Sequence, residues 1–461
     1  MLNPVKAGIA LFESEDSMAL SGLDIYKQLP RTNCKECGFP TCLAFAMQIA
    51  AKKVELNKCP HVSEEGKQAL ESASRPPIRL VTVGTGEGKL DIGNETVLFR
   101  HEETFYHPTG IGLLIEDTLG ASELEAKIAK INKLQFERVG QEIGVNLIAL
   151  KCVSKKAEPF IEAVKKVLSQ SQLNLVLMSE EPELIKAAAP LVKERRPLIY
   201  AATKDNFEPM AKLAKEYSLP LAVRADSLDA LAELTQKLTA QGLEDLVLDS
   251  GTKNLSEKIN ELTQIRRLAL KKAFRPLGYP TIAITSSDEP YQEITEAASY
   301  IAKYAAIVIM KALEPWQVLP LLTVRQNIYT DPQKPLQVEP KVYEVGQVNT
   351  QSPVLVTTNF SLSYYTVEAE VEASRVPAYI ISSYSEGLSV LTAWAAEKFT
   401  AETITKTLNE CGIKEKVSHQ EIIIPGYVAV LSGKLEEDSG WKVRVGPKEA
   451  SGIPSFLKSL K

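Results

Sequence analysis

Apolar and polar positions alternate in a regular way between residues 110 and 325. Short apolar runs recur along this stretch, and each is followed by residues with helical spacing. This alternation is typical of a parallel sheet with helices outside it. Eight such units fit a closed β/α barrel of the TIM type better than an open sheet. The expected strands are residues 111–116, 146–151, 173–178, 197–201, 220–224, 245–249, 280–285 and 305–310.

A second α/β pattern follows the proline-rich segment 331–335. It predicts a doubly wound sheet with helices between the strands. The loops at the carboxyl ends of its strands collect glycines and small hydroxyl residues, at the edge where open sheets bind ligands. Such loops suit a large, flat molecule with amides at its rim, although hydroxyl-rich turns are also ordinary loop chemistry. The expected strands are residues 353–357, 378–382, 421–424 and 442–445, and the loops are 357–363, 382–392, 425–426 and 446–452.

The amino-terminal part of the chain forms a separate small module. Two prolines, Pro76 and Pro77, end its helical periodicity. We therefore expect three domains, at residues 18–75, 76–330 and 331–461. Because Met18 could itself be a start, residues 1–17 are read as an extension outside the folded unit.

A glycine-rich segment, residues 84–88, follows the boundary at Pro76 and Pro77. It lies between two apparent strands, residues 78–83 and 95–100. A phosphate-binding loop would need a helix after the glycines, so a β-hairpin is the preferred interpretation.

Four cysteines in the amino-terminal module are spaced Cys-x2-Cys-x4-Cys-x16-Cys-Pro. They are Cys34, Cys37, Cys42 and Cys59. Thiolates ligate iron-sulfur clusters, whereas structural zinc usually takes two similar close pairs. The spacing therefore favours a cluster, with zinc, disulfides and unreactive thiols as the alternatives.

Thr41 is the expected cap of a helix that starts at Cys42. A helix that continued to residue 57 would carry the chain roughly 20 Å from Cys42. Cys59 can share a metal centre with Cys42 only if the chain turns back, and we expect this turn at residues 53–55.

Composition sets mild limits on function. The 461 residues are 44% hydrophobic, enough to bury the cores of two or three domains. A formal charge of -5 and the lack of a basic stripe argue against nucleic acid as the main partner. No apolar stretch reaches membrane-spanning length, and acidic residues follow the apolar run 7–12, which is wrong for a signal peptide. We expect a cytoplasmic protein, a setting that weakens the disulfide alternative for the cysteines.

The expected barrel offers charged and hydroxyl residues at its carboxyl-terminal strand ends, where barrel enzymes place their chemistry. Glu116 or Asp117 could form an acid/base pair with Asp249, but rim charges are commonly just solvated, and we interpret the barrel as a scaffold. His101 and His107 precede it, beside aromatic residues, and are read as packed or exposed. The strand-end residues are Glu116, Asp117, Lys151, Ser179, Thr203, Arg224, Asp249, Ser250, Ser286 and Lys311.

The cysteine module, the eight-unit barrel and the hydroxyl-rimmed last domain together resemble the large (gamma) subunits of corrinoid iron-sulfur proteins of the acetyl-CoA decarbonylase/synthase system. The resemblance runs from about Met18 to the end of the chain. It implies a methyl carrier of the reductive acetyl-CoA (Wood-Ljungdahl) pathway of anaerobes. A partner methyltransferase would pass a methyl group from methyl-tetrahydrofolate to the cobalt of a corrinoid, and acetyl-CoA synthase would receive it.

The resemblance also implies which residues hold the cofactors. Cys34, Cys37, Cys42 and Cys59 would ligate a [4Fe-4S] cluster that returns Co(II) to Co(I). A cobalamin-type corrinoid would lie on the last domain, covered by a small partner subunit. No catalytic side chain is expected, because the cofactor performs the bond chemistry. The implied corrinoid contacts are Thr357, Ser363, Gly387, Leu388, Ser389, Val390, Ala450 and Ser451.

The Asp-x-His-x-x-Gly pattern that supplies a histidine to cobalt in many cobalamin enzymes is absent from the sequence. We therefore expect no protein imidazole on cobalt. Two other function classes stay open: an electron-transfer protein that carries the cluster but no corrinoid, and a zinc-bearing interaction scaffold.

Overall fold

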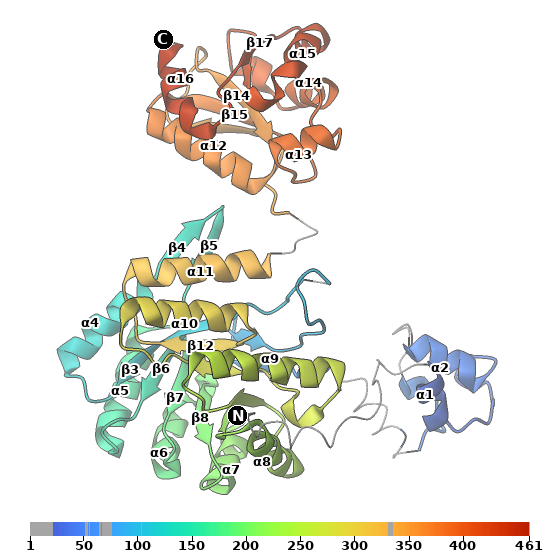
Figure 1. The fold of residues 1–461 in the computed structure, drawn as a ribbon, viewed down its shortest axis with the longest axis vertical. Helices are drawn as coiled ribbons and strands as arrows, with labels where there is room; N and C mark the ends of the chain where they lie inside the picture. Colours follow the sequence, from blue (N-terminus) through green and yellow to red (C-terminus); the bar gives the residue numbers. More distant parts are fainter. Residues whose placement is uncertain are drawn as a thin grey trace, which may run out of the picture. The chain divides into compact units, whose positions relative to one another are not determined.

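The structure, a computed structural model, describes residues 22–50, 54, 56–63, 66, 76–102, 104–330 and 335–460. It divides into two compact units, residues 1–135 with 144–329 and residues 136–143 with 330–461 (Figure 1). The expected extension at residues 1–17 lies outside the described residues, as does most of the expected turn at 53–55. The three expected domain ranges stay a prediction. No helix among the described residues is long and apolar enough to cross a membrane.

The first unit contains an eight-stranded parallel barrel. Its strands follow the order β10-β9-β8-β7-β6-β3-β12-β11, and a parallel bridge between Leu248 and Thr281 joins β10 to the start of β11. The barrel prediction is confirmed, with each expected strand end within two residues of the observed one. The strands are β3 (Gly110–Glu116), β6 (Leu147–Lys151), β7 (Asn174–Met178), β8 (Leu198–Ala202), β9 (Leu221–Arg224), β10 (Leu246–Asp249), β11 (Ile282–Ile284) and β12 (Ile307–Met310).

Amphipathic helices surround the strands. In α5, Phe160, Val164 and Val167 are buried at helical spacing, which is why this segment packs on the sheet as a helix. Ser227 and Asn254 cap the starts of α8 and α9 through their side chains. The helices are α4 (Ala121–Asn132), α5 (Ala157–Gln170), α6 (Pro182–Val192), α7 (Phe207–Tyr217), α8 (Leu228–Ala240), α9 (Leu255–Lys271), α10 (Pro290–Ala302) and α11 (Pro315–Tyr329).

An antiparallel hairpin covers the amino-terminal end of the barrel. Its strands are β1 (Val81–Val83) and β2 (Leu90–Ile92), and their apolar side chains join the barrel core. The hairpin interpretation is confirmed, but the expected second strand at residues 95–100 is wrong. That segment is irregular, and the side chain of Glu95 within it is buried.

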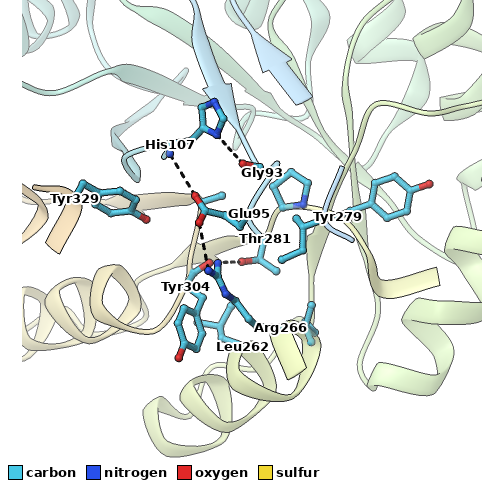
Figure 2. A pocket seen from close by; sticks show the side chains of 13 residues that line it. Gly93, Glu95, His107, Leu262, Arg266, Tyr279, Thr281, Tyr304 and Tyr329 are labelled. Atoms are coloured by element: carbon cyan, nitrogen blue, oxygen red, sulfur yellow. Dashed lines mark hydrogen bonds and ion pairs between the residues drawn. The ribbon is translucent and has the colours of Figure 1, made fainter. Parts of the chain in front are cut away.

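Glu95 forms a buried ion pair with Arg266 of α9, at 3.3 Å between Oε2 and Nη2 (Figure 2). The guanidinium of Arg266 also lies over the rings of Phe105 and Tyr304, with centroids 4.8 and 4.7 Å away. The Glu95 Oε1 accepts the backbone N–H of His107, whose ring Nδ1 lies 2.7 Å from the Gly93 oxygen. His107 is therefore a packed, hydrogen-bonded histidine at the amino end of the barrel.

The second unit contains a five-stranded sheet in the order β13-β15-β14-β16-β17. β14 (Val354–Thr358), β15 (Ala378–Ser383), β16 (Glu421–Ile424) and β17 (Lys442–Val445) are parallel and match the four expected strands. The edge strand β13 (Val342–Val345) is antiparallel and was missed, because it is short and mostly half-exposed. The strand order reverses between β14 and β16, which makes this the topological switch point of a doubly wound sheet.

Helices cover both faces of this sheet. The inward side chains of α14 and α15 pack with Val356, Ile381 and Ile424 on one face, and those of α12 and α16 pack with Leu355 and Ile380 on the other. Because successive side chains of a strand point to opposite faces of the sheet, each strand contributes to two hydrophobic cores. The helices are α12 (Ser361–Ser374), α13 (Val390–Ala395), α14 (Ala401–Glu410), α15 (Ser432–Ser439) and α16 (Ile453–Ser459).

A further hairpin, β4 (Gln135–Arg138) and β5 (Gln141–Gly144), interrupts the sequence of the barrel and groups mostly with the second unit. Val139 and Gly140 make its two-residue turn with φ of 53° and 67°. The sequence analysis missed it. The available signal was the glycine-containing turn between two polar-apolar alternations.

Arg266→Met should lower the free energy of unfolding of the barrel by about 3 to 5 kcal/mol, because it leaves the Glu95 carboxylate buried and unpaired. Urea denaturation followed by hydrogen exchange in the barrel strands measures this. Lys130→Met is the matched control, since Lys130 pairs with Glu314 on the exposed surface, where such pairs are worth less than about 1 kcal/mol. Equal losses in the two variants would contradict the assignment.

Candidate functional site

The cysteine module is built around two short helices, α1 (Gly22–Gln28) and α2 (Cys42–Ala50). Ile25 of α1 and Phe45 of α2 are buried beside Cys42 and Cys59, so two of the four thiols belong to the apolar core of the module. The hydroxyl of Thr41 accepts the Ala44 N–H at 3.0 Å, which confirms the expected cap.

The loop that carries the first two cysteines has an unusual backbone. Asn33, Lys35 and Gly38 all have left-handed φ values, of 50°, 68° and 85°. The Asn33 side chain accepts the N–H of Cys42 at 2.8 Å and ties the start of the loop to the start of α2. Alternation of left- and right-handed residues turns successive N–H groups toward one side, a geometry found at anion and iron-sulfur sites.

The four thiols differ in exposure. Cys42 and Cys59 are buried, Cys37 is half-buried and Cys34 is exposed. Burial raises the pKa of the Cys59 thiol, and the negative charges of the other three thiolates raise it further. Four thiols close enough to repel one another as thiolates fit a site that a positive metal centre would stabilise.

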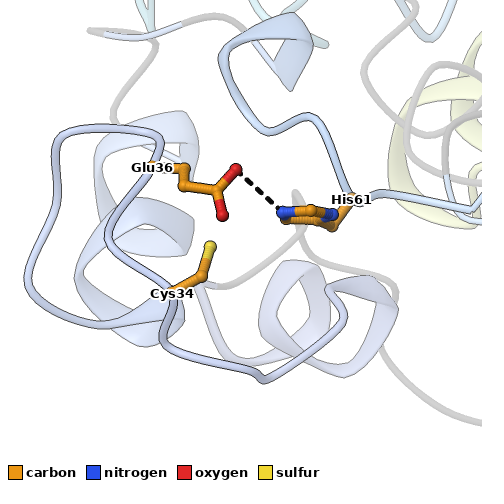
Figure 3. Close-up of side chains that lie close together, drawn as sticks. All are labelled: Cys34, Glu36 and His61. Atoms are coloured by element: carbon orange, nitrogen blue, oxygen red, sulfur yellow. Dashed lines mark hydrogen bonds and ion pairs between the residues drawn. The ribbon is translucent and has the colours of Figure 1, made fainter.

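Cys34 also has two non-sulfur neighbours (Figure 3). Ligand atoms of Cys34, Glu36 and His61 lie within 4.8 Å of one another, and His61 Nε2 is 2.9 Å from Glu36 Oε2. A Cys-His-Glu set is one that zinc accepts. The sequence analysis missed Glu36 and His61, although Glu36 lies between two cysteines and His61 directly follows Cys59 and Pro60.

The second candidate site lies at the carboxyl edge of the parallel strands in the C-terminal domain, and Asn359 organises it. Its fully buried side chain accepts the backbone N–H groups of Ser385 and Gly387 through Oδ1, at 2.9 and 3.0 Å. Its amide nitrogen donates to Gln337 Oε1 at 2.9 Å. One amide thus fixes the loop after β15. Asn359 was not among the expected contact residues.

Glycine is required at position 387. Its φ is 72°, and a Cβ there would lie 2.6 Å from the Cγ of Gln337. The loop can therefore pass close to Gln337 only without a side chain at this position.

The eight residues expected to contact a corrinoid lie at or after the carboxyl ends of three strands of this sheet. Thr357 is buried in β14 and Ser363 is half-buried in the first turn of α12. Leu388 and Val390 are partly buried against one domain core, and Ala450 against the other, so these three turn only part of their surface outward. The others are Gly387 and Ser389, in the loop after β15, and Ser451, after β17.

Three hydroxyls at the ends of β14 and β15 have buried oxygens with no hydrogen-bond partner within the described part of the chain. They belong to Thr357, Thr358 and Ser382. A buried polar atom without a partner costs about 1 to 3 kcal/mol. These three hydroxyls at the edge of the sheet can therefore form further hydrogen bonds, which fits a ligand with amides at its rim.

Apolar side chains gather at the same edge. Every large hydrophobic residue that is exposed between residues 335 and 460 follows or ends a parallel strand at its carboxyl end. Exposed apolar side chains that collect at one edge favour a site for a ligand or a partner protein. The residues are Leu362, Tyr384, Leu391, Trp394, Tyr427, Val430 and Val445.

The barrel does not form the acid/base pair considered from the sequence. Asp117 accepts the N–H groups of Val153 and Ser154, at 2.8 and 3.0 Å, and Asp249 is held by Tyr200 and Lys258. Burial alone would raise the pKa of Asp117, but hydrogen bonds from Ser154 and Cys152 lower it overall. Asp117 is thus an ionised, loop-holding residue.

Comparison with known proteins identifies the family. A family model described as "CO dehydrogenase/acetyl-CoA synthase delta subunit" matches residues 80–457, and one described as "Putative Fe-S cluster" matches residues 29–61, which include all four cysteines. The corrinoid/iron-sulfur protein large subunit of Moorella thermoacetica is 50% identical, over 96% of this chain and 99% of the relative. The chain belongs to the family of corrinoid/iron-sulfur protein large subunits.

Other members of this family are also similar along their whole length. The acetyl-CoA decarbonylase/synthase complex subunit gamma of Methanothermobacter thermautotrophicus is 37% identical over 96% of this chain and 99% of the relative. The subunit gamma of Archaeoglobus fulgidus is 36% identical over 95% and 98%. Among solved structures, a dihydropteroate synthase from Thermus thermophilus covers 54% of this chain and 100% of its own, at 16% identity and a TM-score of 0.38.

The match to the cluster family model favours an iron-sulfur cluster over zinc as the metal centre of the module. The matched segment contains Cys34, Cys37, Cys42 and Cys59, so we assign the module to an iron-sulfur cluster.

Alkylation of cluster-free protein should follow the exposure of the thiols. After anaerobic removal of iron by a chelator, iodoacetamide should label Cys34 at least about tenfold faster than Cys42 or Cys59, because the buried thiols are less accessible. Labelling of Cys59 should accelerate at higher pH, since its raised pKa leaves little thiolate near neutrality. Mass spectrometry of peptides gives the order, and uniform labelling would contradict this geometry.

Asn359→Ala should lower the free energy of unfolding of the C-terminal domain by about 3 kcal/mol, because it orphans two buried N–H groups. The amides of Ser385 and Gly387 should then exchange hydrogen much faster. Asn409→Ala is the control, since Asn409 contacts Lys414 on the exposed surface of α14. Unchanged protection at residues 385 and 387 would exclude Asn359 as the organiser of the loop.

Proposed function

We propose that this chain is the corrinoid-bearing subunit of a methyl carrier in the reductive acetyl-CoA pathway. When bound, the corrinoid would accept a methyl group from methyl-tetrahydrofolate through a partner methyltransferase and give it to acetyl-CoA synthase, while the cluster would return an electron to oxidised cobalt. The observation that carries the proposal is the pairing, in one chain, of a four-thiol module with a hydroxyl-lined, apolar sheet edge. The full-length similarity to corrinoid/iron-sulfur protein large subunits supports it.

In the module, the buried and exposed thiols would have different tasks. Cys42 and Cys59 are fixed in the apolar core and would anchor the cluster. Cys34 lies at the surface, so that side of the cluster would face outward. An electron carrier needs one such exposed side, because transfer to a partner centre depends on close approach.

In the C-terminal domain, the residues fit a wide amphipathic ring. The loop held by Asn359 carries the half-buried Ser389 and no bulky polar side chain beside it, and the unpaired hydroxyls of Thr357, Thr358 and Ser382 would offer polar contacts. The histidine of this domain, His419, binds the Ser352 oxygen at 3.0 Å, at the opposite, amino-terminal edge of the sheet. Within residues 335–460, no imidazole lies at the carboxyl edge, so the proposal assigns no protein histidine to cobalt.

The exposed apolar residues at this edge favour a protein partner as well as a ligand. Trp394, Tyr427 and Val430 are 41%, 44% and 72% exposed, and exposed aromatic and aliphatic side chains are typical of protein interfaces. We infer that a small subunit covers the bound corrinoid here. The resulting heterodimer would dock in turn with the methyltransferase and with acetyl-CoA synthase.

Ser389→Phe should reduce cobalt content at least about fivefold and leave iron unchanged, because the bulky ring would occupy the loop surface meant for the corrinoid. Metal analysis of anaerobically purified protein with its small subunit is the measurement. Ser418→Phe is the control, since Ser418 is exposed at the amino edge of the same sheet. Wild-type preparations with iron but no cobalt would support the alternative, an electron-transfer protein without corrinoid.

Cys37→Ala should impair the function of the cluster and leave that of the corrinoid intact. Reductive reactivation should be lost, while methyl transfer from chemically pre-reduced protein survives, because the corrinoid edge does not involve this residue. Cys152→Ala in the barrel should change neither property. Normal reactivation in the Cys37 variant would contradict a role for the cluster.

A further inference from the structure

A cavity of about 600 Å³ opens at the carboxyl ends of the barrel strands. Each of the eight strands contributes a lining residue from its last positions or from the residue after it. A cavity of this size suits a small organic molecule, and in barrels of this type this end carries the ligand sites. Leu114, Met178 and Ile284 give the cavity an apolar floor.

A buried polar group lies beside this floor. Asp249 accepts the Tyr200 hydroxyl at 2.6 Å and the Lys258 ammonium at 2.7 Å, and Lys258 also donates to Ser250 at 3.1 Å. The Lys258 side chain is only 2% exposed. An ammonium has three N–H donors, and these contacts use two of them. Within the described residues, the third has no protein acceptor.

The rim of the cavity is positively charged. Among the lining residues, six are cationic and three are acidic, although the whole chain carries a formal charge of -5. Glu180 is already paired with Arg224, and Asp249 with Lys258. The cations are Lys151, Lys155, Arg224, Lys253, Lys258 and Lys311, and the acids are Glu180, Glu181 and Asp249.

Two of these cations are uncompensated. Lys151 ends β6 and Lys253 lies in the loop after β10, and both are exposed. Neither has an ion pair or side-chain hydrogen bond with any residue that the structure describes. A cleft lined by one sign of charge, with apolar walls, raises the local concentration of ions of opposite charge.

We propose that the mouth of this barrel is a second ligand site, which binds a small organic anion. The apolar body of the ligand lies on Leu114, Met178 and Ile284, and its carboxylate or phosphate group binds Lys151 and Lys253. The free N–H of Lys258 supplies a further donor at depth. This site is separate from the methyl-carrier function proposed above, because it uses neither the cysteine module nor the C-terminal sheet.

A simply solvated rim does not account for these features. Solvated rim charges are exposed, whereas Lys258 is buried, and burial of an ion pair carries a desolvation cost that packing of the barrel alone does not require. The strand-end residues Lys151, Arg224 and Asp249, which the sequence pattern attributed to a scaffold, all line this one cavity.

Isothermal titration of the full-length anaerobic protein, with its small subunit, tests the proposal. The probes are phenyl phosphate and benzoate, with benzamide as the neutral analogue and benzylamine as the cation. At least one anion should bind saturably with 1:1 stoichiometry. Benzamide and benzylamine should bind at least about tenfold more weakly. Preference between the anions tells a phosphate site from a carboxylate site.

The double variant Lys151→Gln and Lys253→Gln should weaken anion binding at least about tenfold, and raised salt should weaken it in the parent protein. Lys165→Gln is the control, because Lys165 is exposed on α5 and does not line the cavity. Cobalt and iron content should be unchanged in all variants. No saturable binding of either anion, or binding that the double variant leaves intact, would overturn the proposal.

Discussion

Parallel strand pairing is the constraint on which both large domains depend. Because every strand of a parallel set ends at the same edge, loops that are far apart in sequence are brought together there. In the C-terminal domain this edge collects Thr357 from the end of β14, and Gly387 and Ser451 from the loops after β15 and β17. In the barrel it collects Lys151, Asp249 and Lys258 around one cavity. The cysteine module lacks such a sheet and uses a short loop instead.

Two buried ion pairs mark the opposite ends of the barrel and differ in their surroundings. Glu95 and Arg266 at the amino end are enclosed by aromatic rings and by backbone donors. The cavity beside them has room for about one water molecule. Asp249 and Lys258 at the carboxyl end adjoin a much larger, open cavity. The ion pair at the amino end thus lies in a closed environment, whereas the one at the carboxyl end lies beside an open cavity that Lys258 lines.

The proposed division of labour between the thiol module and the C-terminal domain follows from what each can hold. Four thiolates require a positive centre, because they repel one another when deprotonated. The sheet edge instead combines small residues, spare hydroxyls and apolar surface, a mixture suited to an uncharged face with a polar rim. The two sites thus suit different cofactors, in keeping with the proposed carrier that also maintains its own oxidation state.

The sequence by itself determined the barrel strands, the four parallel strands of the C-terminal sheet and the cysteine set, because these depend on local periodicity and spacing. Tertiary structure alone decided the rest. The role of Asn359 depends on contacts with residues 337, 385 and 387, and the meeting of Glu36 with His61 depends on a loop closure across 25 positions. The charged mouth of the barrel was hidden for the same reason. Its cations lie on separate strands, and only barrel closure reveals that Lys151 and Lys253 face one cavity without acidic partners among the described residues.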